Sequence, residues 1–154
     1  MFAPGTLFSH IFHASPVAMT INALADGRYV DVNDSYVRLI GFSREEMIGR
    51  RAVDLGILSR RQRESVVQNL LQSRGLANDP QELRHRSGQV RQVIVSAQLE
   101  EHEGALYTVA IIQDLTDYHR TQNVLRTYES RFQLFFESVP LPVLVFEVET
   151  LRIL

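Results

Sequence analysis

The stretch NDSYVRLIGFSREEMIGR, residues 33–50, contains a closely spaced series of helix start and stop signals. Asn33 is a typical N-cap residue, and Gly41 is placed to end the helix in the left-handed conformation. The apolar positions of this first helix are Tyr36, Val37, Leu39 and Ile40. Ser43 and Glu46 form a capping box for a second short helix, which Gly49 ends. The stretch therefore predicts two short helices joined by a tight link.

The residues before this stretch predict a helix followed by a hairpin. Residues 6–14 place apolar side chains at helical spacing, and Pro16 then ends the helix. Residues 17–24 are typical of a strand, residues 25–27 (ADG) of a turn, and residues 28–33 of the returning strand.

After the stretch, residues 59–75 predict a further helix that Gly75 ends. Its expected buried stripe consists of Val66, Val67, Leu70 and Leu71. From Pro80 the period changes to two, which indicates an antiparallel meander of three strands. These strands are residues 81–86, 90–99 and 105–114, with turns at 87–89 and 100–104. The expected fold class is α+β, with short helices on one face of a five-stranded antiparallel sheet.

The C-terminal part repeats the beginning of the chain. FHASPVAMTI (12–21) returns as FESVPLPVLV (136–145), and Phe8, Phe12, Pro16 and Arg28 recur at one constant offset as Phe132, Phe136, Pro140 and Arg152. A heptad-like stripe leads into the second copy and consists of Tyr118, Thr121, Leu125, Tyr128, Phe132 and Phe135. The repeat predicts that a second domain of the same kind begins here.

Composition narrows the possible chemistry. Among 154 residues, 45% are apolar and 22% charged, and the net charge is −2. These values are typical of a soluble globular domain and give no sign of a nucleic-acid partner. The chain has no Cys, which excludes disulfides, thiolate nucleophiles and cysteinyl cofactor adducts, and all 16 cationic residues are Arg. Without a leader or a long apolar segment, the chain is expected to be cytoplasmic.

The order of elements, the stretch 33–49 and the pair Asp114 and Thr116 resemble a PAS domain of the bacterial sensory-box type. The resemblance covers about residues 5–120. It divides the chain into an N-terminal amphipathic helix (1–14), a PAS domain (15–115), a linker helix (116–131) and the start of a second PAS domain (132–154).

The resemblance implies a sensory module of a multidomain bacterial signalling protein, such as a two-component system, with no catalysis of its own. Asp114 and Thr116 would relay the state of the sheet to the outgoing helix, or would only cap that helix. A downstream output domain, such as a histidine kinase or a cyclic-dinucleotide enzyme, is expected. The alternative is a structural PAS module that dimerises or binds a partner protein without a small-molecule ligand.

Cofactors are considered one by one. The flavin and para-coumaroyl photosensors need a reactive Cys, so the absence of Cys excludes their adducts. Haem is not expected, because haem-binding relatives usually carry a His on the long helix and residues 59–75 have none. His10 and His13 lie three residues apart, but no acidic or Cys partner stands near them in the sequence. No metal site is expected.

What remains is an apolar pocket for an unknown small molecule, or a packed core without room for one. The candidate pocket residues are Met19, Ile21, Tyr36, Leu39, Met47, Ile94, Thr108, Ala110 and Ile112, with Leu106 on the same face of the last strand. The opposite face of that strand is also apolar. It is expected to be covered by the N-terminal helix or by a second copy of the chain. A homodimer is predicted through Phe8, Ile11, Phe12, Leu125, Tyr128 and Phe132.

Overall fold

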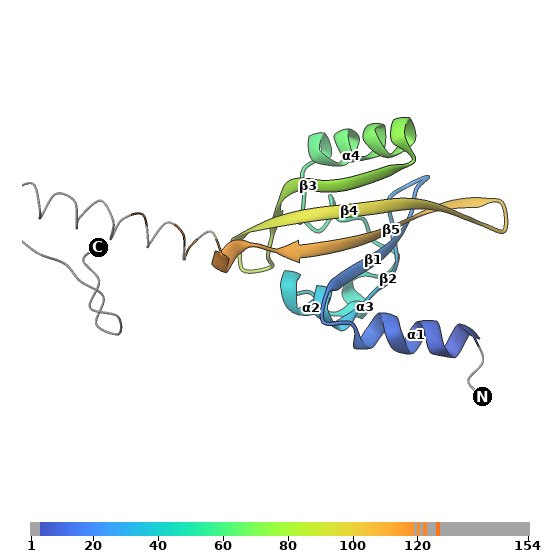
Figure 1. Cartoon of the computed structure of the whole chain (residues 1–154), viewed down its shortest axis with the longest axis horizontal. Coiled ribbons are helices and arrows are strands. Elements are labelled where there is room, and N and C mark those ends of the chain that lie inside the picture. Colours follow the sequence, from blue (N-terminus) through green and yellow to red (C-terminus); the bar gives the residue numbers. More distant parts are fainter. Residues whose placement is uncertain (1–3, 119, 121, 123–125, 127–154) are drawn as a thin grey trace, which may run out of the picture. The chain divides into compact units, whose positions relative to one another are not determined.

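The computed structural model describes residues 4–118, 120, 122 and 126. The chain divides into two compact units, residues 1–116 and residues 117–154, and all the elements below belong to the first. In chain order they are α1 (Pro4–Ala14), β1 (Ala18–Ala23), β2 (Tyr29–Val32), α2 (Asp34–Ile40), α3 (Arg44–Met47), α4 (Arg60–Ser73), β3 (Gly75–Arg84), β4 (Val90–His102) and β5 (Ala105–Asp114) (Figure 1).

The five strands form one antiparallel sheet in the order β2-β1-β5-β4-β3, which confirms the expected fold class. The first strand therefore lies next to the last one. Thr20 stands opposite Ala110 and Asn22 opposite Thr108 on one face of this pair. We call this face, which the core and helices α2–α4 cover, the inner face.

The core lies between the inner face and the helices. Tyr36, Ile40, Met47 and Leu70 from the helices are buried with strand residues such as Val93. Ile57, from the irregular segment 51–58, is 1% exposed and completes this core. The burial of these apolar side chains is the main force that holds helices and sheet together.

The predicted caps of the short helices are confirmed. The Asn33 side chain accepts a hydrogen bond from the Tyr36 N–H, and Gly41 adopts φ 83° at the end of α2. Ser43 and Glu46 form both bonds of the capping box at the start of α3. These capping bonds form within a single turn of helix, so they depend only on nearby residues.

Three predicted boundaries were wrong. Helix α4 ends at Arg74, which adopts φ 54°, so Gly75 begins strand β3 instead of ending the helix. Strand β3 starts earlier than expected because a register shift between Leu76 and Asp79 accommodates Asn78 at φ 52°. The β4–β5 turn is shorter than predicted, since only Glu103 and Gly104 separate the strands and both have positive φ. This pair of left-handed residues is typical of a two-residue hairpin.

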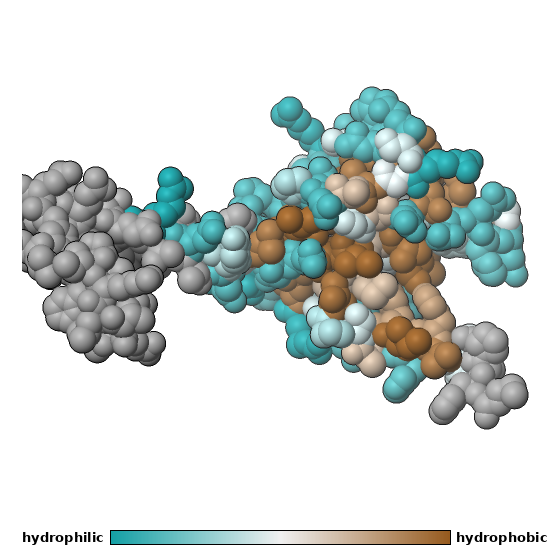
Figure 2. All heavy atoms as spheres, viewed as in Figure 1, coloured by the Kyte–Doolittle hydropathy of each residue, from teal (hydrophilic) through white to brown (hydrophobic). Residues whose placement is uncertain are grey.

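The outer face of the sheet is apolar and partly open. It carries Met19 opposite Ile111 and Ile21 opposite Val109. Ile111 is 43% exposed, so α1 does not cover this face fully. Hydrophobic residues gather over β1 and β5 and along α1 on the side of the molecule seen in Figure 2. None of the helices that the structure describes combines the length and the apolar character needed to cross a membrane.

Candidate ligand-binding cavity

A cavity of about 450 Å³ lies between the inner face of the sheet, the segment 51–58 and helix α4. Its size falls in the range of natural small-molecule sites, roughly 300–1,000 Å³. It is lined by Thr20, Asn22, Asp26, Gly27, Tyr29, Tyr36, Arg51, Ala52, Val53, Asp54, Leu58, Arg60, Arg63, Glu64, Val66, Gln81, Leu83, Val95, Ala97, Thr108, Ala110 and Ile112.

Two buried tyrosines supply hydroxyl groups to this lining. The Tyr29 and Tyr36 hydroxyl oxygens lie 2.7 Å apart, and the two side chains are each 3% exposed. Burial raises the pKa of Tyr36 to about 12, so both rings stay neutral at physiological pH. Because one hydroxyl donates to the other, the pair keeps one O–H that neither tyrosine uses.

Thr108 lies on β5 and lines the cavity. It is 6% exposed, and its Oγ1 atom has no hydrogen-bond partner among the described residues. Its neighbours on the same face, Ala110 and Ile112, also line the cavity. A buried hydroxyl without a partner costs roughly 1–3 kcal/mol, so Thr108 lowers the stability of the fold while the cavity is empty.

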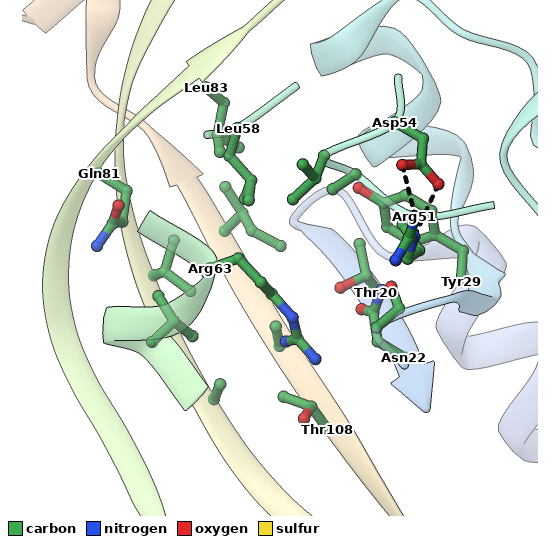
Figure 3. Close-up of a pocket in the computed structure, with 18 of the residues that line it drawn as sticks. Thr20, Asn22, Tyr29, Arg51, Asp54, Leu58, Arg63, Gln81, Leu83 and Thr108 are labelled. Atoms are coloured by element: carbon green, nitrogen blue, oxygen red, sulfur yellow. Dashed lines mark hydrogen bonds and ion pairs between the residues drawn. The ribbon is translucent and has the colours of Figure 1, made fainter. Parts of the chain in front are cut away.

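Arg63 extends from α4 into the cavity. Its Nη2 donates to the carbonyl oxygen of Leu24 at 3.2 Å, and its guanidinium packs on Gly27, where an added Cβ would lie 2.9 Å from Nε. In Figure 3 the side chain points away from α4 toward the region of Asn22 and Thr108. Burial lowers the pKa of Arg63, and the Asp26 carboxylate opposes this effect.

Two carboxylates of the lining, Asp54 and Asp26, have arginine partners. Arg51 donates two hydrogen bonds to Asp54, at 2.8 and 2.9 Å (Figure 3). Asp26 is paired with Arg28 at 3.1 Å. Within the described residues, by contrast, no carboxylate lies within ion-pair distance of Arg63. Its positive charge is therefore compensated only at longer range, by the Asp26 carboxylate.

The structure places the predicted pocket residues in three groups. Tyr36, Thr108, Ala110 and Ile112 line the cavity, and Leu106 does not. Met19, Ile21 and Ile94 do not line it either, because the register puts them on the outer face. Met47 is fully buried in the core, and Leu39 lines a separate groove beside Ser35 and Asp114. The prediction for β1 was thus wrong by one residue, since Thr20 and Asn22 face inward.

Asp114 and Thr116 lie at the end of β5 and are bonded to each other. The Asp114 carboxylate accepts hydrogen bonds from the Thr116 N–H, at 2.9 Å, and from its hydroxyl. The Thr116 hydroxyl also accepts from the Gln92 N–H of β4 at 3.0 Å, and Leu115 N–H donates to the Gln92 carbonyl. We call these four residues the junction. It fixes the end of β5 to β4 where residues 116–118 become helical.

The predicted interface residues divide in a similar way. Phe8 and Ile11 are 56% and 60% exposed on α1, whereas Phe12 is 2% exposed and is therefore wrong as a contact residue. Leu125, Tyr128 and Phe132 lie outside the described residues, as does the predicted second domain.

His13 was expected to have no acidic neighbour, but the structure places two carboxylates near its ring. Its Nε2 lies 3.6 Å from Asp31 and its Nδ1 lies 3.9 Å from Asp34. The fold brings these carboxylates from β2 and α2 to the end of α1. Still, in the part of the chain that the structure describes, no three acidic, His or Cys side chains gather as metal ligands would.

Sequence reasoning missed Arg63, the segment 51–58 and the polar inner residues of β1. A charged residue in a helix is usually taken as solvent-facing. A signal was nevertheless present, because Arg63 lies three residues before Val66 and seven before Leu70. These spacings place all three on one helix face.

Comparison with known proteins agrees with this architecture. A family model described as PAS fold matches residues 12–120. No curated protein shows a significant match to the sequence.

Among solved structures, a PAS domain from Colwellia psychrerythraea superposes with a TM-score of 0.64 and 16% identity, over 75% of this chain and 99% of that one. A PAS domain from a two-component sensor histidine kinase gives 0.61 and 16%, over 71% and 96%. A domain of the sensory box sensor histidine kinase/response regulator from Geobacter sulfurreducens gives 0.55 and 22%, over 69% and 91%. At these identities the likeness concerns the fold. With the match over residues 12–120 and the five-stranded antiparallel sheet, the chain belongs to the PAS fold family.

Proposed function

We propose that this chain is a sensory module of a signalling protein, whose input is a small organic molecule bound in the cavity. The observation that carries the proposal is the cavity of about 450 Å³ with a buried hydroxyl that has no partner among the described residues. A domain that only needed a core would gain stability by filling this space with apolar side chains. The similarity to a PAS domain from a sensor histidine kinase supports the same role.

The proposed input is neither haem nor a cysteinyl flavin. The sequence has no Cys, and neither His nor Met is among the residues that line the cavity. The lining instead offers hydroxyl, amide and guanidinium groups on apolar walls, which suits an organic molecule with a polar end.

The proposed output path is strand β5. Its residues Thr108, Ala110 and Ile112 line the cavity, and the same strand ends at Asp114 in the junction. A ligand that shifts β5 along β4 would alter the bond between Thr116 and Gln92, which ties the end of β5 to β4, and with it the bond of Thr116 to Asp114. The structure gives the junction a bonding role, and the relay through it is our proposal.

We further propose that the module works as a homodimer in the cytoplasm, with a second PAS domain and an output domain beyond it. The exposed apolar side chains of α1 and of the outer face support a second copy as the partner. Replacing Ile111 with Glu should convert the dimer to a monomer in sedimentation analysis. Glu101→Gln, an exposed change on β4, is the control. An unchanged mass for Ile111→Glu would contradict the proposed interface.

Two measurements on the 154-residue chain test the sensory role. Native mass spectrometry of the purified protein should detect a bound small molecule, and a panel of metabolites should contain compounds that raise the melting temperature. For a ligand at 100 times its dissociation constant, the expected stabilisation is about 2.7 kcal/mol. Hydrogen exchange at Leu115 and Thr116 should change with the same compounds. If no compound shifts the melting temperature, the structural alternative, a PAS module that only dimerises, is favoured.

A further inference from the structure

Arg63 is a cation of the cavity lining that forms no ion pair with any described residue, and the exposed Asp26 carboxylate acts on it only from beyond ion-pair distance. Arg51 is bonded to Asp54, while Arg60 and Glu64 are exposed side chains one helical turn apart. Arg63 is partly buried, and its guanidinium donates a hydrogen bond to the neutral carbonyl of Leu24. A guanidinium carries five N–H donors, so most of its donor capacity remains for another acceptor.

The remaining polar groups of the inner wall add donors to those of Arg63. The Thr108 hydroxyl has no partner among the described residues, and the Tyr29–Tyr36 pair keeps one O–H. The carboxylates of the lining, from Asp26, Asp54 and Glu64, are exposed side chains. The interior therefore combines a cation and hydroxyl donors with apolar walls, which complements a ligand that has an anionic acceptor end and an apolar body.

We propose that the cavity binds an apolar monocarboxylate, whose carboxylate accepts hydrogen bonds from Arg63 and Thr108 while its body packs on the aliphatic wall. This wall consists of Val66, Leu83, Val95, Ala97, Ala110 and Ile112. The inference rests on the proposed function, because it names the ligand class of the same cavity. A guanidinium suits a carboxylate well, since its planar fork can form two parallel hydrogen bonds.

The apolar wall favours the binding of a monocarboxylate over that of other anions. The other cations of the lining are Arg51, which is bonded to Asp54, and the exposed Arg60, so a second charge of a dicarboxylate or a phosphate ester inside the cavity would have no buried cation as its partner. Burying that charge without a partner costs more than the first ion pair returns. A simple hydrocarbon or alcohol would fill the space but would leave the Arg63 charge unmatched.

The test uses calorimetric titration of the 154-residue chain with matched pairs of probes, sodium hexanoate against hexanamide and sodium benzoate against benzamide. Each pair has the same body and differs in the charge of its acceptor end. We expect each carboxylate to bind at least about ten-fold more tightly than its amide, since a hydrogen bond to a charged group exceeds a neutral one by that margin. Equal affinities within a pair would overturn the inference.

Three variants test which side chains contact the carboxylate of the ligand. Arg63→Met should weaken carboxylate binding about ten-fold or more and leave amide binding within about two-fold. Arg61→Met removes a charge from an exposed position of the same helix and should change neither. Thr108→Val keeps the shape of the side chain and should weaken carboxylate binding several-fold. Circular dichroism and the melting temperature of each variant show whether it is folded. If folded Arg63→Met bound hexanoate as tightly as the parent chain, the inference would be wrong.

The outcomes also separate this inference from the proposed function. If amides and carboxylates bind equally and Arg63→Met has no effect, the monocarboxylate class is wrong while a ligand-binding module stands. If neither member of any pair binds at millimolar concentration, and no metabolite of the wider panel binds either, both the ligand class and the sensory role are contradicted. Preferential binding of carboxylates that depends on Arg63 supports both.

Discussion

Asn33 and Thr108 both have buried polar side chains, but the two side chains differ in the number of hydrogen bonds that they form. Asn33 is 0% exposed, and its side chain forms four hydrogen bonds. It accepts from the N–H groups of Met19 and Tyr36 and donates to the carbonyls of Phe12 and Val17. Thr108 is 6% exposed, and its hydroxyl has no partner among the described residues.

The difference separates structural from functional use of a buried polar group. Asn33 joins the end of α1, strand β1 and the start of α2, so its hydrogen bonds stabilise the fold. Thr108 stands in the cavity with Arg63, where donors are left for a ligand. A fully bonded polar group stabilises a unique structure, whereas an unused donor in a cavity lowers stability until something binds to it.

The largest expected effect is that of Asn33→Ala. The change removes an N-cap and leaves several buried backbone groups without partners, so we expect unfolding free energy to fall by about 4 kcal/mol. Chemical denaturation monitored by circular dichroism measures this loss. Asn22→Ala is the matched control, because Asn22 lines the cavity and its side chain makes one long bond of 3.5 Å. A loss below about 1 kcal/mol for Asn33→Ala would remove the contrast between the two regions.

An intermediate effect on stability is expected for Gly→Ala changes at two glycines of positive φ, one at the end of α2 and one in the cavity lining. A Cβ on Gly41, at φ 83°, would meet the His85 ring, whereas one on Gly27, at φ 77°, would meet the flexible end of Arg63. Both changes carry the cost of a left-handed residue, about 1–2 kcal/mol. Gly41→Ala should therefore destabilise more than Gly27→Ala in thermal denaturation. The reverse order would show that Arg63 is held more rigidly than its single bond to Leu24 implies.

The smallest expected effect on stability is that of Thr108→Val. Because the hydroxyl has no partner to lose, the free energy of unfolding without ligand should stay within about 1 kcal/mol or rise. The same denaturation experiment measures it, and Thr20→Val on the neighbouring strand provides a second buried threonine of the inner face for comparison. A loss above about 2 kcal/mol would mean that Thr108 stabilises the fold as Asn33 does.

The local signals of the sequence predicted the fold well. The caps that Asn33, Gly41 and the Ser43–Glu46 box form lie within a single turn, so residue type and spacing suffice to predict them. The cavity was harder because both faces of the sheet carry apolar residues, and alternation alone does not say which set faces inward. On β1 the more apolar set, Met19 and Ile21, lies outside.

The register between distant strands decides the lining, and it is a property of the folded sheet. Pairing of Thr20 with Ala110 and of Asn22 with Thr108 places two polar residues of β1 in the cavity. Arg63 reaches the same space from α4, far along the sequence from both strands. The hydrophobic periodicity of a single segment cannot predict that these separate segments line the same cavity.

The sensory role that we propose requires the cavity on the inner face of the sheet to be a binding site. The most direct test records intermolecular nuclear Overhauser effects between hexanoate and the methyl groups of two adjacent residues, Ile111 and Ile112. Ile112 lines the cavity, and Ile111 lies on the exposed outer face. We expect contacts from hexanoate to Ile112, together with Val66 and Val95, and none to Ile111. Contacts to Ile111 alone would place the ligand on the outer face and contradict the claim.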